Sequence, residues 1–169
     1  MSALHTHWRS RAIGLTRIAF GLIWTIDALF KWQPAFLFNF TGYLTDAQAG
    51  QPDWVVDWIG FWVHLTGGAP VLFAVLVALV ESGLAVSLLF GVFSNLAYVG
   101  GALLTLVIWA VPESFGGPYT AGATDVGTGI IYTLVFILLL ATRAGVHLGF
   151  DRAVGQRLGR HAWLASGSH

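Results

Sequence analysis

Cysteine is absent from the 169 residues of this chain. A chain without thiols forms no disulfide bond, has no thiol nucleophile and supplies no thiolate to an iron–sulfur cluster or another metal. Histidine does not replace it, because only His64 and His147 lie near apolar segments and no two transmembrane histidines are available to ligate a haem. We therefore predict no metal site, and redox chemistry would need an electron carrier from outside the chain.

Charged residues are also scarce. Asp, Glu, Lys and Arg make up 9% of the chain, whereas soluble domains carry about 25%. Hydrophobic residues make up 56%, and the mean hydropathy is +0.74. Eight basic and eight acidic side chains cancel, so no basic excess indicates nucleic acid as a partner. This composition predicts one integral membrane domain over residues 1–169, in contact with the lipid bilayer.

Four apolar segments predict an all-α bundle of four transmembrane helices. The first does not resemble a signal peptide, because it is too long, contains Arg17 and Asp27, and is followed by no A-x-A cleavage pattern. Pro34 and Pro112 help to end the first and third segments. The predicted spans are about 12–32, 71–93, 96–111 and 126–142.

The segment between the first two spans predicts a further helix over about 52–66. Trp54, Trp58 and Trp62 recur at every fourth residue and share one face of that helix. Such a face is typical of an amphipathic helix lying in the membrane interface. A loop helix packed on its own bundle is the alternative, and both interpretations place it at the outer surface.

The distribution of basic residues predicts the orientation. Lys and Arg concentrate before the first span and after the last, whereas the loops 33–70 and 113–125 contain none. The positive-inside rule then places both tails, 1–11 and 143–169, in the cytoplasm. We expect a multi-pass protein of the cell (inner) membrane. The basic residues of the tails are Arg9, Arg11, Arg143, Arg152, Arg157 and Arg160.

Two ionisable residues lie deep in the predicted spans. An ionisable side chain in hydrocarbon costs a few kcal/mol, so it usually faces protein or water. The helical rise puts Arg17 about 21 Å, and Glu81 about 15 Å, from the outer ends of their helices. We predict that Glu81 pairs with Arg17, either as a structural pair that fixes helix register or with a proton- or ligand-linked role.

A second polar group is expected at the outer surface. Asp27 and Lys31 stand four residues apart and can pair on their own helix. Alternatively, they belong to a polar cup closed by the Gly-rich loop, in which backbone amides and Lys31 meet an anion or a polar headgroup. The other candidate members of this cup are His64, Glu113, Tyr119 and Asp125.

These groups define the candidate site residues. The candidate catalytic residues are Asp27, Lys31, Glu81 and Asp125. The candidate ligand-binding residues are Arg17, Trp24, Trp109 and Tyr119. A quinone would suit such a protein, because ring stacking on Trp24 or Trp109 and a carboxylate for protons require no metal.

Three segments resemble the DoxX/DoxD family. They are R-x-x-x-G-x(5)-D-x-x-x-K from Arg17 to Lys31, ESGLAVSLLFGVFSNLAYVGG, and GGPYTAGATDVGTGIIYTLVF from Gly116 to Phe136. The resemblance implies a four-helix membrane protein. Some members are subunits of a thiosulfate:quinone oxidoreductase, which oxidises thiosulfate to tetrathionate, passes electrons to quinone and has a second, smaller subunit. It implies no particular catalytic residue.

Three functions stay open on these observations. The first is a membrane subunit of a quinone-linked oxidoreductase, with thiosulfate as donor and quinone as a non-covalent cofactor. The second is a non-catalytic membrane subunit that anchors or assembles a redox partner protein. The third is a conduit for protons or a small molecule along Arg17, Glu81 and Asp27. A partner subunit or a homo-oligomer is expected in each case.

Overall fold

Every regular element in the described part of the chain is helical. The computed structural model describes the backbone of residues 2–166 and the side chains of residues 7–166; the last three residues of the expected C-terminal tail lie outside this range. The α-helices are α1 (Ser2–Lys31), α2 (Pro34–Leu37), α3 (Phe40–Asp46), α4 (Asp53–Gly67), α5 (Pro70–Phe90), α6 (Ser94–Ala110), α7 (Thr128–Ala141) and α8 (Asp151–Arg157). Short 3-10 helices are η1 (Ser114–Gly116), η2 (Ala144–Val146) and η3 (Gly159–Leu164).

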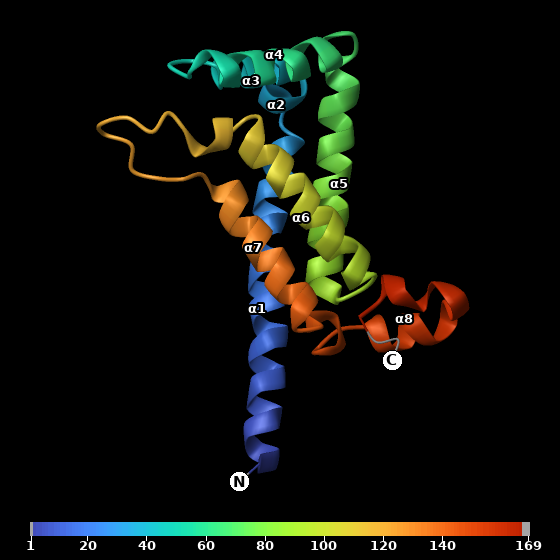
Figure 1. The fold of residues 1–169 in the computed structure, drawn as a ribbon. Coiled ribbons are helices and arrows are strands. Elements are labelled where there is room, and N and C mark those ends of the chain that lie inside the picture. The colour runs from blue at the N-terminus through green and yellow to red at the C-terminus, as the bar shows by residue number, and fades with distance from the viewer. Residues whose placement is uncertain (1, 167–169) are drawn as a thin grey trace.

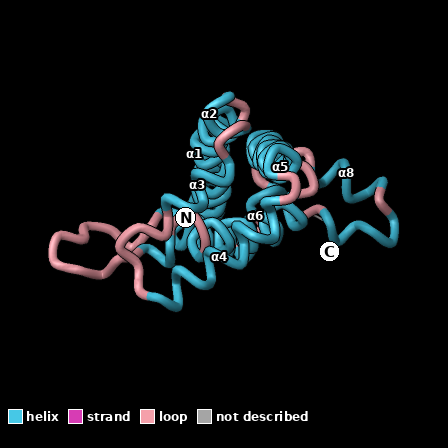
Figure 2. Tube along the Cα trace, turned by 90° about the horizontal axis from the view of Figure 1, so that it is seen from above, coloured by secondary structure: helices cyan, strands magenta, loops and turns pink. Residues whose placement is uncertain are grey.

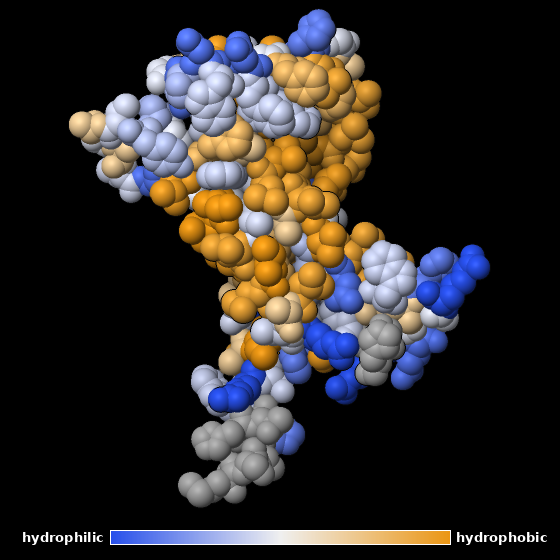
Figure 3. Space-filling view, viewed as in Figure 1, coloured by the Kyte–Doolittle hydropathy of each residue, from blue (hydrophilic) through white to orange (hydrophobic). Residues whose placement is uncertain are grey.

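Two of these helices are long and apolar enough to cross a membrane. They are His7–Lys31 within α1, with 25 residues, and α5, with 21 residues. Helices α6 and α7 are also apolar but shorter, with 17 and 14 residues. In the space-filling view, hydrophobic side chains form a band between hydrophilic regions at the two ends (Figure 3). The all-helical prediction is confirmed, and the surface band is compatible with contact with a bilayer.

Helix α1 begins earlier than expected. The sequence predicts a polar lead over 1–11, whereas the helix starts at Ser2 and its first turns extend beyond the other helices (Figure 1). Residues 2–11 contain neither proline nor glycine, so nothing in them interrupts the helix.

The long helices pack as two pairs, α1 with α5 and α6 with α7. Glycines bring the members of each pair close together. A Cβ atom on Gly21 would lie 3.0 Å from the Leu89 nitrogen, and one on Gly129 would lie 2.7 Å from the Thr105 carbonyl oxygen. The Thr105 and Thr133 hydroxyls also share a hydrogen bond of 2.8 Å across the second pair.

Large aromatic rings join the two pairs. Phe20 and Trp24 of α1 meet Tyr132 and Phe136 of α7, with ring centroids 5.1 to 5.5 Å apart. These tilted and edge-on arrangements are favourable for aromatic pairs. Close approaches inside each pair therefore occur at glycines, whereas Phe20, Trp24, Tyr132 and Phe136 make ring contacts between the pairs.

Helices α2, α3 and α4, residues 34–67, lie across one end of the bundle and form what we call the roof (Figures 1 and 2). Trp58 Nε1 donates to the Ala110 carbonyl at 2.9 Å, and Ser114 Oγ donates to the Ala47 carbonyl at 2.5 Å. Phe40 and Leu44 pack against Ala74 and Val111 beneath them. Helix α4 occupies the segment predicted to be helical, whereas α2 and α3 fall in a region expected to be loop.

The opposite end of the bundle, which we call the tail end, carries residues 147–166, which we call the tail. The Phe150 amide donates to the Phe90 carbonyl at 3.1 Å, which sets the tail beside the turn between α5 and α6. By contrast, the loop between α6 and α7 projects sideways from the bundle in both backbone views (Figures 1 and 2). The sequence predicted that this loop closes the end of the bundle opposite the tail. That prediction is wrong, because the roof covers this end and the loop does not.

Candidate functional site

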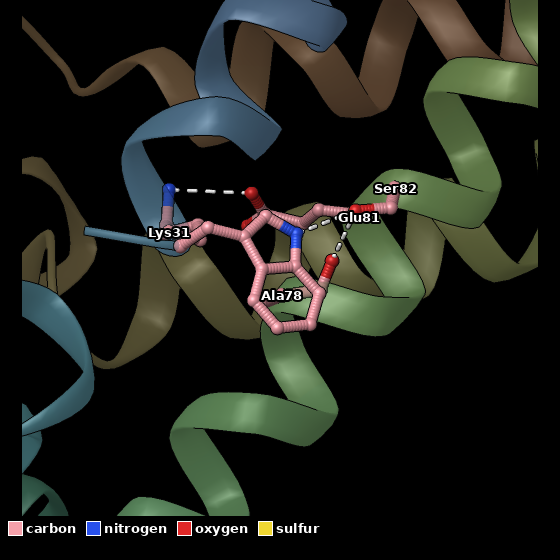
Figure 4. Close-up of polar contacts among 5 residues, drawn as sticks. Lys31, Ala78, Glu81 and Ser82 are labelled. Carbon is pink, nitrogen blue, oxygen red and sulfur yellow. Dashed lines mark hydrogen bonds and ion pairs between the residues drawn. The ribbon is translucent and has the colours of Figure 1, made fainter. Parts of the chain in front are cut away.

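An ion pair lies between α1 and α5 under the roof. Lys31 Nζ is 3.3 Å from Glu81 Oε2 (Figure 4), and the Glu81 side chain is 1% exposed. Lys31 is the last residue of α1, where the helix dipole favours a positive charge. Nearby, Trp32 Nε1 donates to Ser82 Oγ of α5 at 3.0 Å, which fixes the end of α1 against α5.

The predicted pair between Arg17 and Glu81 is wrong. The fully buried Arg17 lies at the tail end, where Nη1 donates to the carbonyls of Leu88 and Leu89. Nη2 donates to the carbonyls of His147 and Leu148. The prediction assumed that the outer ends of α1 and α5 lie at one depth. Helix α5 instead begins beyond the end of α1, at the roof (Figure 1), so Glu81 lies level with Lys31.

The alternative pair between Asp27 and Lys31 is also wrong within the described part of the chain. Lys31 pairs with Glu81, and Asp27 forms no ion pair there. Asp27 and Lys31 nevertheless line one cavity, as the prediction of a polar cup stated.

That cavity, which we call the polar chamber, has a volume of about 130 Å³. It lies between the two helix pairs. Its lining includes Trp24, Asp27, Lys31, Tyr43, Glu81, Glu113 and Tyr132. Three carboxyl groups and one ammonium group therefore surround a space between aromatic walls.

The three carboxyl groups differ in their contacts. Glu81 pairs with Lys31. Glu113 accepts hydrogen bonds from Thr128 Oγ1 at 2.5 Å and from the Gly129 amide at 2.8 Å, so it caps the start of α7. Asp27 has no polar partner among the described residues, so it is the carboxyl group of the chamber that is available to a ligand or a proton.

A second cavity, the apolar chamber, adjoins the first and has a volume of about 160 Å³. It lies between the roof and the adjacent parts of α5 and α6. Its lining includes Phe36, Phe40, Trp62, Phe73 and Val77. The two chambers share Lys31, Tyr43, Glu81 and Ile108. The ion pair thus stands at the boundary between a polar and an apolar space.

Each chamber also has a buried hydrogen-bond donor without an acceptor in the described part of the chain. Trp24 Nε1 belongs to a residue lining the polar chamber, and Trp62 Nε1 to one lining the apolar chamber. A buried donor left unpaired costs about 1–3 kcal/mol, and an acceptor on a ligand or a water molecule relieves that cost.

Tyr43 contributes a third donor. Tyr43 is 44% exposed; partial burial raises the pKa of its phenol, and the nearby carboxyl groups of Glu113, Glu81 and Asp27 raise it further. The phenol consequently stays protonated at neutral pH. It lines both chambers, so its hydroxyl can donate a hydrogen bond at their boundary.

The remaining candidate residues lie elsewhere. Asp125 Oδ1 accepts hydrogen bonds from the amides of Val126 and Gly127 at 2.6 and 3.0 Å, and Trp109 Nε1 donates to the Val126 carbonyl at 2.8 Å. Tyr119 is 67% exposed and donates to the Phe115 carbonyl. These three residues hold the projecting loop and line neither chamber. His64 is exposed on α4.

Sequence reasoning missed the aromatic residues that the roof adds to the site. Phe36, Phe40 and Tyr43 stand at positions i, i+4 and i+7, a spacing typical of one helical face. That spacing was the available signal, but Asn39 and Gly42 interrupt the apolar pattern, and the three residues fall on two short helices, α2 and α3.

The described residues form no metal centre beside the two chambers. Among the described side chains, residues 7–166, no group of three His, Asp or Glu residues is placed to hold a metal ion. Comparison of the chain with protein-family models, with curated proteins and with solved structures found no match, and the DoxX/DoxD resemblance stays a prediction from the sequence.

Proposed function

We propose that this chain is a DoxX/DoxD-like membrane subunit of a quinone-linked oxidoreductase, with the quinone ring in the polar chamber. One observation carries the proposal: a polar and an apolar chamber meet at the Lys31–Glu81 ion pair. A molecule that fills both has a polar head and an apolar extension, as an isoprenoid quinone has.

The size and chemistry of the chambers suit this substrate. A protein cavity of about 150 Å³ admits benzene, and the polar chamber, at about 130 Å³, is close to that size. Trp24 and Tyr132 offer ring faces. Lys31, Tyr43 and Trp24 Nε1 are donors for the two ring carbonyl oxygens, and the aromatic lining of the apolar chamber suits the first part of the tail.

Reduction of a quinone to a quinol consumes two electrons and two protons. Asp27 is the residue proposed to transfer protons, because Glu81 and Glu113 already hold other groups. Lys31 and Tyr43 orient the ring and stabilise negative charge on its oxygens.

The electron donor binds elsewhere under this proposal. Two thiosulfate ions release two electrons when they join as tetrathionate, which balances the reduction of one quinone. The polar chamber has three carboxyl groups and one ammonium group, and it therefore repels a dianion. Thiosulfate oxidation is assigned to a partner subunit, with electrons passing to the quinone site.

The proposed setting is the cell (inner) membrane. Four crossings by α1, α5, α6 and α7 would place the roof on the outer side and both termini in the cytoplasm. The six arginines of the two tails support this orientation.

The test uses the purified full chain in nanodiscs, with a short-tailed quinone as probe and quenching of tryptophan fluorescence as readout. We expect binding by the chain alone, and thiosulfate-dependent quinone reduction once the partner is added. Asp27→Asn should lower that reduction at least tenfold while binding persists, because it removes the proton carrier. Asp53→Asn, at an exposed position of α4, is the control. Absence of quinone binding would overturn the proposal.

A second candidate, a non-catalytic subunit that anchors a redox partner, is favoured by a different surface. The loop between α6 and α7 projects from the bundle (Figure 2), and Trp54, which packs against Phe115 with ring centroids 5.2 Å apart, is 61% exposed. Loss of a co-purifying cofactor protein on shortening this loop, in a chain that binds no quinone, would select this candidate.

A further inference from the structure

Among the described residues, the exposed charged side chains at the tail end of the molecule are all positive. Six arginines there are exposed, and the only acidic residue of this end, Asp151, is fully buried. The opposite half carries the other seven acidic residues and Lys31. The six exposed arginines are Arg9, Arg11, Arg143, Arg152, Arg157 and Arg160.

In the described part of the chain Asp151 forms no ion pair with these arginines, because its oxygens accept hydrogen bonds inside the fold. Oδ1 accepts a hydrogen bond from the Ser94 amide at 3.3 Å, and Oδ2 accepts one from the Ser166 amide at 2.9 Å. Asn95 Nδ2 adds a bond of 2.9 Å to the Trp163 carbonyl. The tail is thus tied at several points to the start of α6.

These ties set the depth of the tail relative to the apolar band. The turn between α5 and α6 is where two apolar helices end, and the tail lies beside it. Figure 3 shows the hydrophilic side chains of this region directly below the hydrophobic band. In a membrane, Arg152, Arg157 and Arg160 would lie at the level of the lipid headgroups.

Exposed apolar side chains accompany the arginines. Leu148, Phe150 and Trp163 are 55%, 60% and 58% exposed, and Phe90 and Phe93 of the neighbouring turn are 52% and 42% exposed. Apolar and aromatic anchors beside cationic groups are typical of segments that lie in a membrane interface. A guanidinium also forms paired hydrogen bonds with phosphate oxygens.

We infer that the tail, residues 147–166, is a docking element for the phosphate-bearing headgroups of anionic phospholipids. Charge complementarity selects this partner over a neutral bilayer, and the fixed depth of the tail selects a lipid surface over a soluble anion. The inference goes beyond the proposed function and does not depend on quinone binding. Each cationic residue near an anionic surface is worth about 1 kcal/mol, so three arginines correspond to a binding advantage on the order of 100-fold.

The experiment compares the full chain in nanodiscs of phosphatidylcholine with the full chain in nanodiscs rich in phosphatidylglycerol. Trypsin cleavage after Arg152, Arg157 and Arg160 is the readout, since all three are exposed in the free protein. We expect cleavage to be slowed at least tenfold in the anionic discs, and the protection to fade as salt is raised.

Variants separate the tail from charge in general. In Arg157→Gln/Arg160→Gln, cleavage after Arg152 should lose most of its protection. Arg9→Gln/Arg11→Gln removes the same charge from the start of α1 and should leave the protection intact. All substituted positions are exposed, and equal melting temperatures check that the fold is preserved.

Three results would overturn the inference. Equal cleavage rates in neutral and anionic discs would show that headgroup charge plays no part. Equal loss of protection in both variants would show attraction without a defined docking element. Protection in neutral discs that appears only with two copies per disc would assign the surface to another copy of the chain.

Discussion

A guanidinium that water does not reach has to find its acceptors inside the fold, and Arg17 finds four carbonyl oxygens. Two belong to the last turn of α5 and two to the segment after η2. The free carbonyls at the end of a helix carry partial negative charge, so they stabilise the cation without a carboxylate. A single side chain thereby links α1, α5 and the tail.

Replacing Arg17 should therefore be costly. We expect Arg17→Met to lower the free energy of unfolding by about 3 kcal/mol or more, because buried carbonyls lose charged donors. Thermal unfolding in detergent measures the change. Arg11→Met, at an exposed position of the same helix, is the control, and similar melting temperatures for the two variants would contradict this account.

The Lys31–Glu81 pair leads to a second prediction at the residue scale. Lys31→Met leaves the nearly inaccessible Glu81 carboxylate without its partner, whereas Lys31→Met/Glu81→Gln removes both charges. We expect the double variant to be more stable than Lys31→Met by about 1 to 3 kcal/mol. Urea unfolding of Lys31→Met, Glu81→Gln and the double variant completes the double-mutant cycle. Strictly additive changes in the free energy of unfolding would show that the pair contributes nothing.

At the scale of the elements, two neighbouring glycines of α6 offer a matched comparison. A Cβ on Gly101 would lie 2.4 Å from the Phe136 ring, whereas one on Gly100 would meet nothing within 4 Å. Gly101→Ala should destabilise the α6–α7 pair by about 1–3 kcal/mol through overpacking. Gly100→Ala should be neutral or slightly stabilising, because alanine favours a helix. Melting temperatures that move together would refute this packing.

The elements also show what a sequence can predict here. Apolar length and tryptophan spacing indicated α1, α5 and α4, because those patterns follow from the helical repeat alone. Relative depth is different: the overhang of α5 beyond α1 depends on where α2, α3 and α4 place its first residue. The sequence therefore placed Lys31 and Asp27 correctly in one polar cavity. It paired Glu81 with Arg17, however, whereas Glu81 pairs with Lys31 and Arg17 lies at the other end of the bundle.

The roof illustrates the same limit from another side. Helix α3 has 7 residues and α2 has 4, too few for a periodic pattern to stand out, and such helices depend on tertiary packing. Their contribution to the apolar chamber could only be seen once α5 and α6 were in place.

At the scale of the whole molecule, the opposite charges of the two ends predict a topology. Among described residues, the tail end has seven arginines including Arg17 and one acid, and the roof half has seven acids and one lysine. We expect a green fluorescent protein fused after the C-terminus to be fluorescent in the cytoplasm. Alkaline phosphatase inserted near Gly122 should be active outside. The reverse pattern would refute the orientation.

The close approaches at glycines within each helix pair, and the ring contacts between the pairs, have a consequence for cooperativity. The close backbone contacts at Gly21 and Gly129 are lost only when the two helices of a pair separate. The ring contacts between α1 and α7, by contrast, can be lost while each pair stays together. The bundle should therefore behave as two units with a seam, and the polar chamber lies in that seam. Amide hydrogen exchange would show α1–α5 and α6–α7 as two slowly exchanging units whose protection rises together when a ligand occupies the chamber between them.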